Sequence, residues 1–149
     1  MDILTIAGVI LAGLLAGEEL VVRYGVHPAL VSLDDVTQLR ARQALIRSLR
    51  VLVPVVFFAT LGTAVAALVV GGPDAGFALR IASVAALAAW LGTTFGGTVV
   101  VNSAVIEWDP EAPPVGWRSL IVRWARLDVV RSTAAVVAFA ATTAAAVLT

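Results

Sequence analysis

Long apolar stretches alternate with short polar segments along this chain, and the pattern predicts α-helices. Three stretches, at residues 51–70, 81–106 and 132–149, contain no charged residue. A helix needs about 20 apolar residues to cross a hydrocarbon core of about 30 Å. Each of these stretches is therefore long enough to span a membrane.

A fourth candidate span lies at residues 3–22. It is apolar as far as Ala16 and then meets Glu18 and Glu19, which fit a span only near an interface or facing protein. A secretory signal peptide is the competing interpretation, but the chain begins Met1-Asp2, without a basic region, and no small-residue cleavage pattern follows. We therefore expect this segment to be retained as a helix.

The sequence thus predicts an all-α fold, a four-helix transmembrane bundle forming one integral membrane domain over residues 1–149. The predicted spans are at about residues 3–22, 50–70, 79–106 and 120–148. Composition agrees, because 60% of residues are hydrophobic, 13% are charged and the mean hydropathy is +1.00. Soluble domains carry about 25% charged residues, so the expected solvent is the lipid bilayer.

The connection between the first two spans combines a predicted corner with an amphipathic helix. Val26-His27-Pro28 predicts a non-helical corner, because proline disfavours helix in the residue before it. Ser32 with Asp35 predicts the next helix start, a cap followed by an acid. Residues 34–50 are amphipathic, with Val36, Leu39, Ile46 and Leu49 on one side and Gln38, Arg42 and Arg50 among the polar positions. We expect this extension to lie at the headgroup level or to continue the second helix into water.

Glycine and proline mark three further features. Residues 71–74, Gly-Gly-Pro-Asp, predict a turn, and Pro54 can kink the second span. Gly92, Gly96 and Gly97 predict close helix approach in the third span, and Gly92 with Gly96 fits the small-xxx-small spacing.

The arginines give the predicted orientation. All ten basic residues are arginine, and only Arg80 falls on the side of the bundle that holds the termini. By the positive-inside rule the arginine-rich side is cytoplasmic, which places both termini outside the cell membrane. The absence of lysine, together with heavy use of alanine, valine and glycine, also indicates a GC-rich bacterial genome.

Most polar and aromatic side chains of interest collect at the arginine-rich end. They are Glu18, Glu19, His27, Arg47, Asn102, Trp108, Trp117, Trp124, Asp128 and Arg131. At about 100° per residue, Trp117, Trp124, Asp128 and Arg131 share one face of the fourth helix. Arg131 lies deep enough to need a carboxylate partner, and Asp128, Glu18 and Glu19 are the candidates. Such a cluster either fixes the register of the helices or forms a site.

Each remaining candidate has a structural alternative. His27 can act as a base near neutral pH, or it is a solvated loop residue. Trp108, Trp117 and Trp124 form either an interfacial belt or the walls of a binding site, and Asn102 either bridges helices or binds a ligand. With one histidine and no cysteine we expect no metal site, and no nucleic-acid-binding patch is present.

A resemblance rests on these same residues. Asn102, then Glu107-Trp108-Asp109-Pro110, Pro113 to Trp117, Arg123-Trp124 and Arg131 resemble the C-terminal signature of the anthrone-oxygenase-like family, whose bacterial members are mostly a domain of unknown function. His27-Pro28-Ala29-Leu30 and the segment from Arg42-Gln43 to Pro54 resemble its N-terminal half. Asp128 stands where the family often has His or Asn, and Val100 where a proline is often found.

The resemblance implies oxidation of an anthrone to an anthraquinone by molecular oxygen, without a cofactor. His27, Asp128 or a glutamate of the first span would be the base, and Arg131 with Asn102 would stabilise the oxyanion. The binding residues would be Glu18, Glu19, Asn102, Trp117 and Trp124. The alternative is a non-enzymatic scaffold, accessory subunit or lipid- or small-ligand-binding protein. A transporter would have to be a homo-oligomer, because four spans without repeats leave little room for alternating access.

Overall fold

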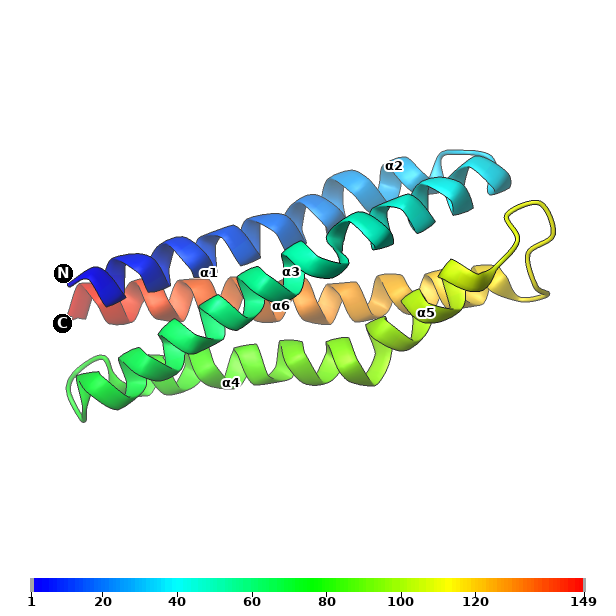
Figure 1. Cartoon of the computed structure of the whole chain (residues 1–149). Helices are drawn as coiled ribbons and strands as arrows, with labels where there is room; N and C mark the ends of the chain where they lie inside the picture. Colours follow the sequence, from blue (N-terminus) through cyan, green and yellow to red (C-terminus); the bar gives the residue numbers. More distant parts are fainter. Residues whose placement is uncertain (1, 149) are drawn as a thin grey trace.

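The computed structural model describes residues 2–148, and Met1 and Thr149 lie outside the described residues. It is an elongated bundle built from four long helical segments, and both the start of α1 and the end of α6 lie at one end (Figure 1). The segments are α1 (Ile3–Val21) continued by η1 (Val22–Val26) and α2 (His27–Val31), α3 (Asp35–Gly71), α4 (Phe77–Thr93) continued by η2 (Thr94–Thr98) and α5 (Val99–Glu107), and α6 (Trp117–Leu148). The predicted four-helix class is confirmed.

All four segments are long and apolar enough to cross a membrane, in the ranges Ile3–Val31, Asp35–Gly71, Phe77–Glu107 and Trp117–Leu148. The protein therefore has the architecture of a multi-pass integral membrane protein. Many large apolar side chains on the outer surface are exposed, for example Val69 and Val70 at 75% each. A bilayer, unlike water, would solvate such a surface.

The first connection differs from the prediction. The chain stays helical through His27 and Pro28, and the predicted corner is wrong because η1 is a π-helical turn. In η1 the N–H of His27 bonds the carbonyl of Val22, and this wider turn lets a helix accommodate the proline that follows. The turn comes instead at residues 32–34, between α2 and α3.

The predicted Ser32 cap is also wrong. Asp34 begins α3, and its Oδ1 accepts a hydrogen bond from the Thr37 N–H at 3.0 Å. Hydrogen bonds from the Thr37 side chain and backbone lower the pKa of the Asp34 carboxyl. From this cap α3 runs unbroken through Pro54, so the amphipathic extension and the second span form one helix.

The turn predicted at residues 71–74 is present. Gly72 ends α3 with a φ of 62°, a backbone conformation that favours glycine. Arg80, which is buried, forms an ion pair with Asp74 and donates to the Gly72 carbonyl at 3.0 Å. Arg80 therefore links the turn at residues 71–74 to α4.

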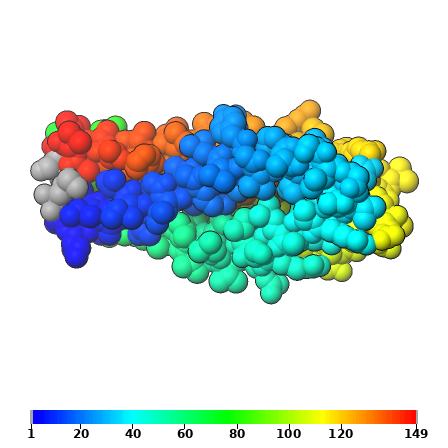
Figure 2. All heavy atoms as spheres, turned by 90° about the horizontal axis from the view of Figure 1, so that it is seen from above, coloured from blue at the N-terminus to red at the C-terminus, as the bar shows by residue number. Residues whose placement is uncertain are grey.

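The interior has two apolar clusters, one toward each end of the bundle. The first surrounds Phe57, Leu87 and Trp90 and fills the half of the bundle that holds the termini. The second surrounds Leu39, Val105 and Trp117 and fills the arginine-rich end. Figure 2 shows α1 and α2 lying between α3 and α6 on one face of the molecule.

Of the three glycines predicted to allow close helix approach in the third span, only Gly97 does so. A side chain added at Gly92 or Gly96 would meet no atom within 4 Å, so neither glycine lies in a helix contact. The close approach is at Gly97 of η2, where an added Cβ would lie 2.7 Å from Leu127 Cδ1 of α6. Here α5 departs from the line of α4 (Figure 1).

Candidate functional site

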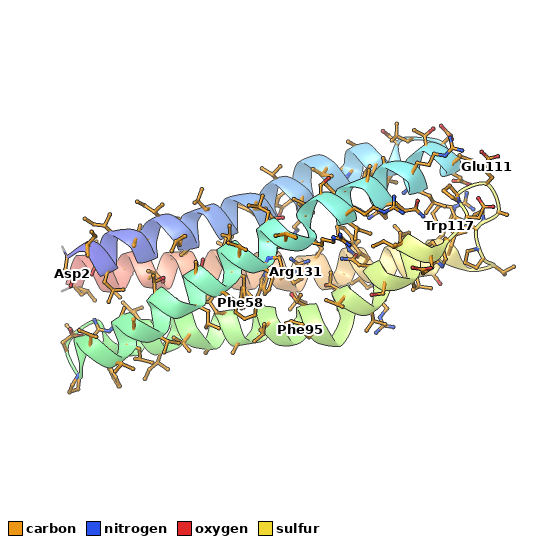
Figure 3. All side chains as sticks on the ribbon, in the orientation of Figure 1. Asp2, Phe58, Phe95, Glu111, Trp117 and Arg131 are labelled. Carbon is orange, nitrogen blue, oxygen red and sulfur yellow. The ribbon has the colours of Figure 1, made fainter. Side chains whose placement is uncertain are left out.

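An ion pair between α1 and α6 lies near the middle of the bundle. Arg131 Nη2 donates to Glu19 Oε1, and the side chains are only 10% and 1% exposed. Arg131 lies near mid-length in Figure 3, far from Trp117 and Glu111 at the arginine-rich end. Of the three acids predicted as partners of Arg131, Glu19 is the one that forms the ion pair.

Trp90 of α4 completes this arrangement. Its Nε1 donates to Glu19 Oε1 at 2.8 Å, and the Arg131 guanidinium lies 4.6 Å from the centre of its ring. Phe57 of α3 stacks on Trp90 with ring centroids 4.2 Å apart. Groups from α1, α3, α4 and α6 are thus connected through one indole ring.

A cavity of about 380 Å³ adjoins this ion pair on the side toward the arginine-rich end. That volume is within the roughly 300–1,000 Å³ typical of small-molecule sites. Its inner wall is formed by residues of α1, η1, α4 and α6, namely Glu18, Val22, Trp90, Trp124, Asp128 and Arg131. Its outer wall is formed by α3 and by η2 with α5, which contribute Leu45, Ile46, Leu49, Arg50, Val53, Pro54, Thr94, Thr98, Val99, Asn102, Ser103 and Ile106.

Several polar atoms in the cavity wall have no hydrogen-bond partner among the described residues. They are Glu18 Oε2, Thr98 Oγ1, Asp128 Oδ1 and Arg131 Nε. Asp128 is the clearest case, since the residue is only 3% exposed. Buried polar groups are nearly always paired with protein or water, so four unpaired atoms among the residues of one cavity wall are unusual.

Two of the predicted site residues form one side of the cavity together. Trp124 Nε1 donates to Asn102 Oδ1 at 3.1 Å, which fixes the indole of α6 against α5. The bond uses the amide oxygen of Asn102 and leaves its NH₂ group able to donate. Asn102 therefore bridges helices and lines the cavity, so the two alternatives stated for it are compatible.

His27 lies behind Trp124 and does not line the cavity. The two rings lie 5.5 Å apart, and the Arg42 guanidinium is 5.0 Å from the Trp124 ring centre and 3.4 Å from His27 Nδ1. Trp117 and Glu19 are likewise absent from the cavity lining, Trp117 belonging to the apolar cluster at the arginine-rich end. The structure thus brings Glu18, Asn102, Trp124, Asp128 and Arg131 together and leaves His27, Trp117 and Glu19 outside their cavity.

Sequence reasoning missed the buried polar residues of α3. Arg42 is only 2% exposed, and its Nε and Nη1 have no hydrogen-bond partner among residues 2–148. Gln43 donates to the carbonyls of Val105 and Trp108, both at 2.9 Å. A signal is present, because Gln38, Arg42 and Gln43 lie close to the apolar Leu39 on the helix surface, although Gln38 and Arg42 were predicted to be polar positions of the amphipathic helix.

Two π-helical turns flank the site. η1 directly follows the α1 segment that carries Glu18 and Glu19, and η2 supplies Thr94 and Thr98 to the cavity wall. Single π-turns inside α-helices occur frequently at functional sites. Among residues 2–148, no group of three or more histidine, aspartate and glutamate side chains is placed to hold a metal ion.

Comparison with protein-family models, with curated proteins and with solved structures finds no match to this chain.

Proposed function

We propose that this protein binds a small aromatic or lipophilic molecule in the cavity and oxidises it with molecular oxygen, without a cofactor, as an anthrone-type oxygenase of the cell membrane. One observation carries the proposal. The buried residues Asp128 and Arg131 both line an aromatic-walled cavity, and each has a polar atom without a hydrogen-bond partner among the described residues. A base and an oxyanion donor then face the same bound molecule.

The chemistry requires few protein groups. An anthrone has acidic benzylic hydrogens, and removing one leaves a carbanion whose charge is shared with the ring carbonyl oxygen. Asp128 would accept that proton, and Arg131 Nε–H with the Asn102 amide would stabilise the oxyanion. The carbanion passes electrons to O₂. One oxygen atom becomes the new carbonyl, and the other leaves as water with the two hydrogens of the original CH₂ group.

Asp128 and Glu18 are better supported as the base than His27. Both acids line the cavity and each has an unpartnered carboxylate oxygen, whereas the Trp124 ring lies against His27. The indoles of Trp90 and Trp124 form the aromatic walls. Aromatic rings attract a flat ligand through offset stacking, worth about 0.5–1.5 kcal/mol beyond area burial.

A second candidate function is a non-enzymatic ligand-binding or accessory protein. The observation that favours it is the direct packing of Glu19, Arg131 and Trp90, which has the form of a device for fixing helix register. This candidate uses the same cavity but requires no turnover.

Oxygen consumption by the purified protein with anthrone tests the proposal, after subtraction of spontaneous air oxidation. Asp128→Asn keeps the shape and hydrogen bonding of the side chain but removes the base, and should slow turnover by roughly 10²–10⁴-fold. His27→Gln, the matched change outside the cavity, should have a much smaller effect. Folded wild-type protein that fails to exceed the background with several anthrones would leave the binding or accessory function in its place.

A further inference from the structure

Both ends of the cavity are closed inside the bundle. Toward the termini, Phe57 stacks on Trp90. Toward the arginine-rich end, the cluster around Leu39, Val105 and Trp117 fills the bundle, and these three residues are 0%, 1% and 7% exposed. Tightly packed, buried side chains therefore lie between that end of the bundle and the cavity.

The side of the bundle between α3 and α5 is not closed in this way. Four residues that line the cavity are also exposed on the outer surface, namely Arg50 and Pro54 of α3 and Val99 and Ser103 of α5. On one side of these four residues, Gln43 of α3 donates hydrogen bonds to the carbonyls of Val105 and Trp108 at the end of α5. The Phe57–Trp90 stack closes the other side. The cavity thus has a lateral mouth between α3 and α5.

Helix lengths indicate the depth of this mouth relative to a membrane. Arg50 lies about 31 Å from Gly71 along α3, and Arg126 about 33 Å from Leu148 along α6, at 1.5 Å per residue. Both arginines are exposed, and no charged residue is exposed on α3 or α6 between them and the far end. A hydrocarbon core of about 30 Å would fit this uncharged belt. Pro54 and Val99 then face acyl chains, while Arg50 lies at the headgroups.

We propose that the cavity is loaded sideways from the bilayer, through the mouth between α3 and α5, and that its ligand is a neutral molecule dissolved in the membrane. Apolar side chains around the mouth, such as Leu49, Val53 and Val99, favour such a molecule over a hydrated one. The acids Glu18 and Asp128 line the inner wall, so an anionic ligand is disfavoured. This inference rests on the proposed function, since it takes the cavity to be a ligand site.

Anthracene is a suitable probe in lipid nanodiscs, because tryptophan emission can excite it when it binds beside Trp90 and Trp124. Stopped-flow mixing would give association and dissociation rates for wild type, for Ser103→Phe and for the control Ser48→Phe. Ser103 is exposed and lines the mouth, whereas Ser48 is exposed on α3 outside the cavity. A narrowed mouth should lower both rates together by at least about tenfold in Ser103→Phe and leave them unchanged in the control.

Unchanged rates in Ser103→Phe, or equal slowing in Ser48→Phe, would overturn the lateral route. Val99→Phe provides the same test at a second position should Ser103→Phe not fold. Wild-type protein that shows no energy transfer to anthracene would overturn the proposed function and the route together. Normal binding without oxygen consumption would contradict the oxygenase alone.

Discussion

Arg131 interacts with two groups at once, the Glu19 carboxylate and the face of Trp90. Removing one partner of a buried pair leaves the other charge without compensation, which costs about 3–5 kcal/mol. Arg131→Ala should therefore lower the thermal unfolding temperature in detergent markedly. Arg126→Ala is the control, since Arg126 is exposed on the same helix. Equal unfolding temperatures for Arg131→Ala and wild type would show that Arg131 is solvated.

Arg131→Lys should recover only part of the lost stability. Lysine keeps the charge and can still reach Glu19, but it lacks the planar guanidinium that lies over the Trp90 ring. The same unfolding experiment measures the recovery. Full recovery would mean that charge alone, without the stacked geometry, stabilises the cluster.

The need for a partner at Arg131 could be predicted from its depth in the fourth helix, but the identity of that partner could not. Glu18 and Glu19 are adjacent in sequence and point in directions about 100° apart on a helix. Only the rotation of α1 against α6 decides that Glu19 pairs and that Glu18 faces the cavity. For Arg42, the spacing beside Leu39 indicates the helix face, but the neighbouring helices that bury this face could not be predicted from α3 alone.

At the scale of elements, the contact between η2 and α6 depends on one glycine. An alanine Cβ at position 97 would meet Leu127 Cδ1 and Cδ2 at 2.7 and 2.8 Å, whereas one at position 96 would meet nothing within 4 Å. The Leu127 side chain must move to admit this Cβ, so Gly97→Ala should leave the protein less stable than Gly96→Ala. Thermal unfolding of the two variants side by side measures this. The opposite order would contradict the described packing of η2 on α6.

Length and hydropathy predicted the four helices, because each long apolar stretch has only one way to satisfy its backbone in lipid. They did not predict the π-helical turns. Pro28 was expected to end the first helix, yet the π-helical turn η1 before it lets the helix continue to Val31. A π-helical turn changes only a few residues of a helix, and the amino-acid composition does not indicate where one occurs.

For the whole molecule, the arginines predict the orientation. Nine of the ten arginines lie toward the end that holds the 32–34 turn and the loop between α5 and α6, and only Arg80 lies at the other end. With that end cytoplasmic, a reporter active only in the cytoplasm should be silent when fused after Thr149. The same reporter inserted in the loop at residues 110–115 should be active. A bright C-terminal fusion would reverse the proposed orientation.

We expect the cavity beside Arg131 to hold a small aromatic ligand. Anthraquinone, which cannot be oxidised further in the proposed reaction, should raise the unfolding temperature of the wild-type protein, because a ligand that binds only the folded state stabilises it. Trp124→Ala should lose most of this increase relative to its own baseline, since Trp124 lines the cavity. Trp117→Ala should keep it, since Trp117 is buried outside the cavity. No increase in the wild type, or equal loss in both variants, would contradict binding of an aromatic ligand in this cavity.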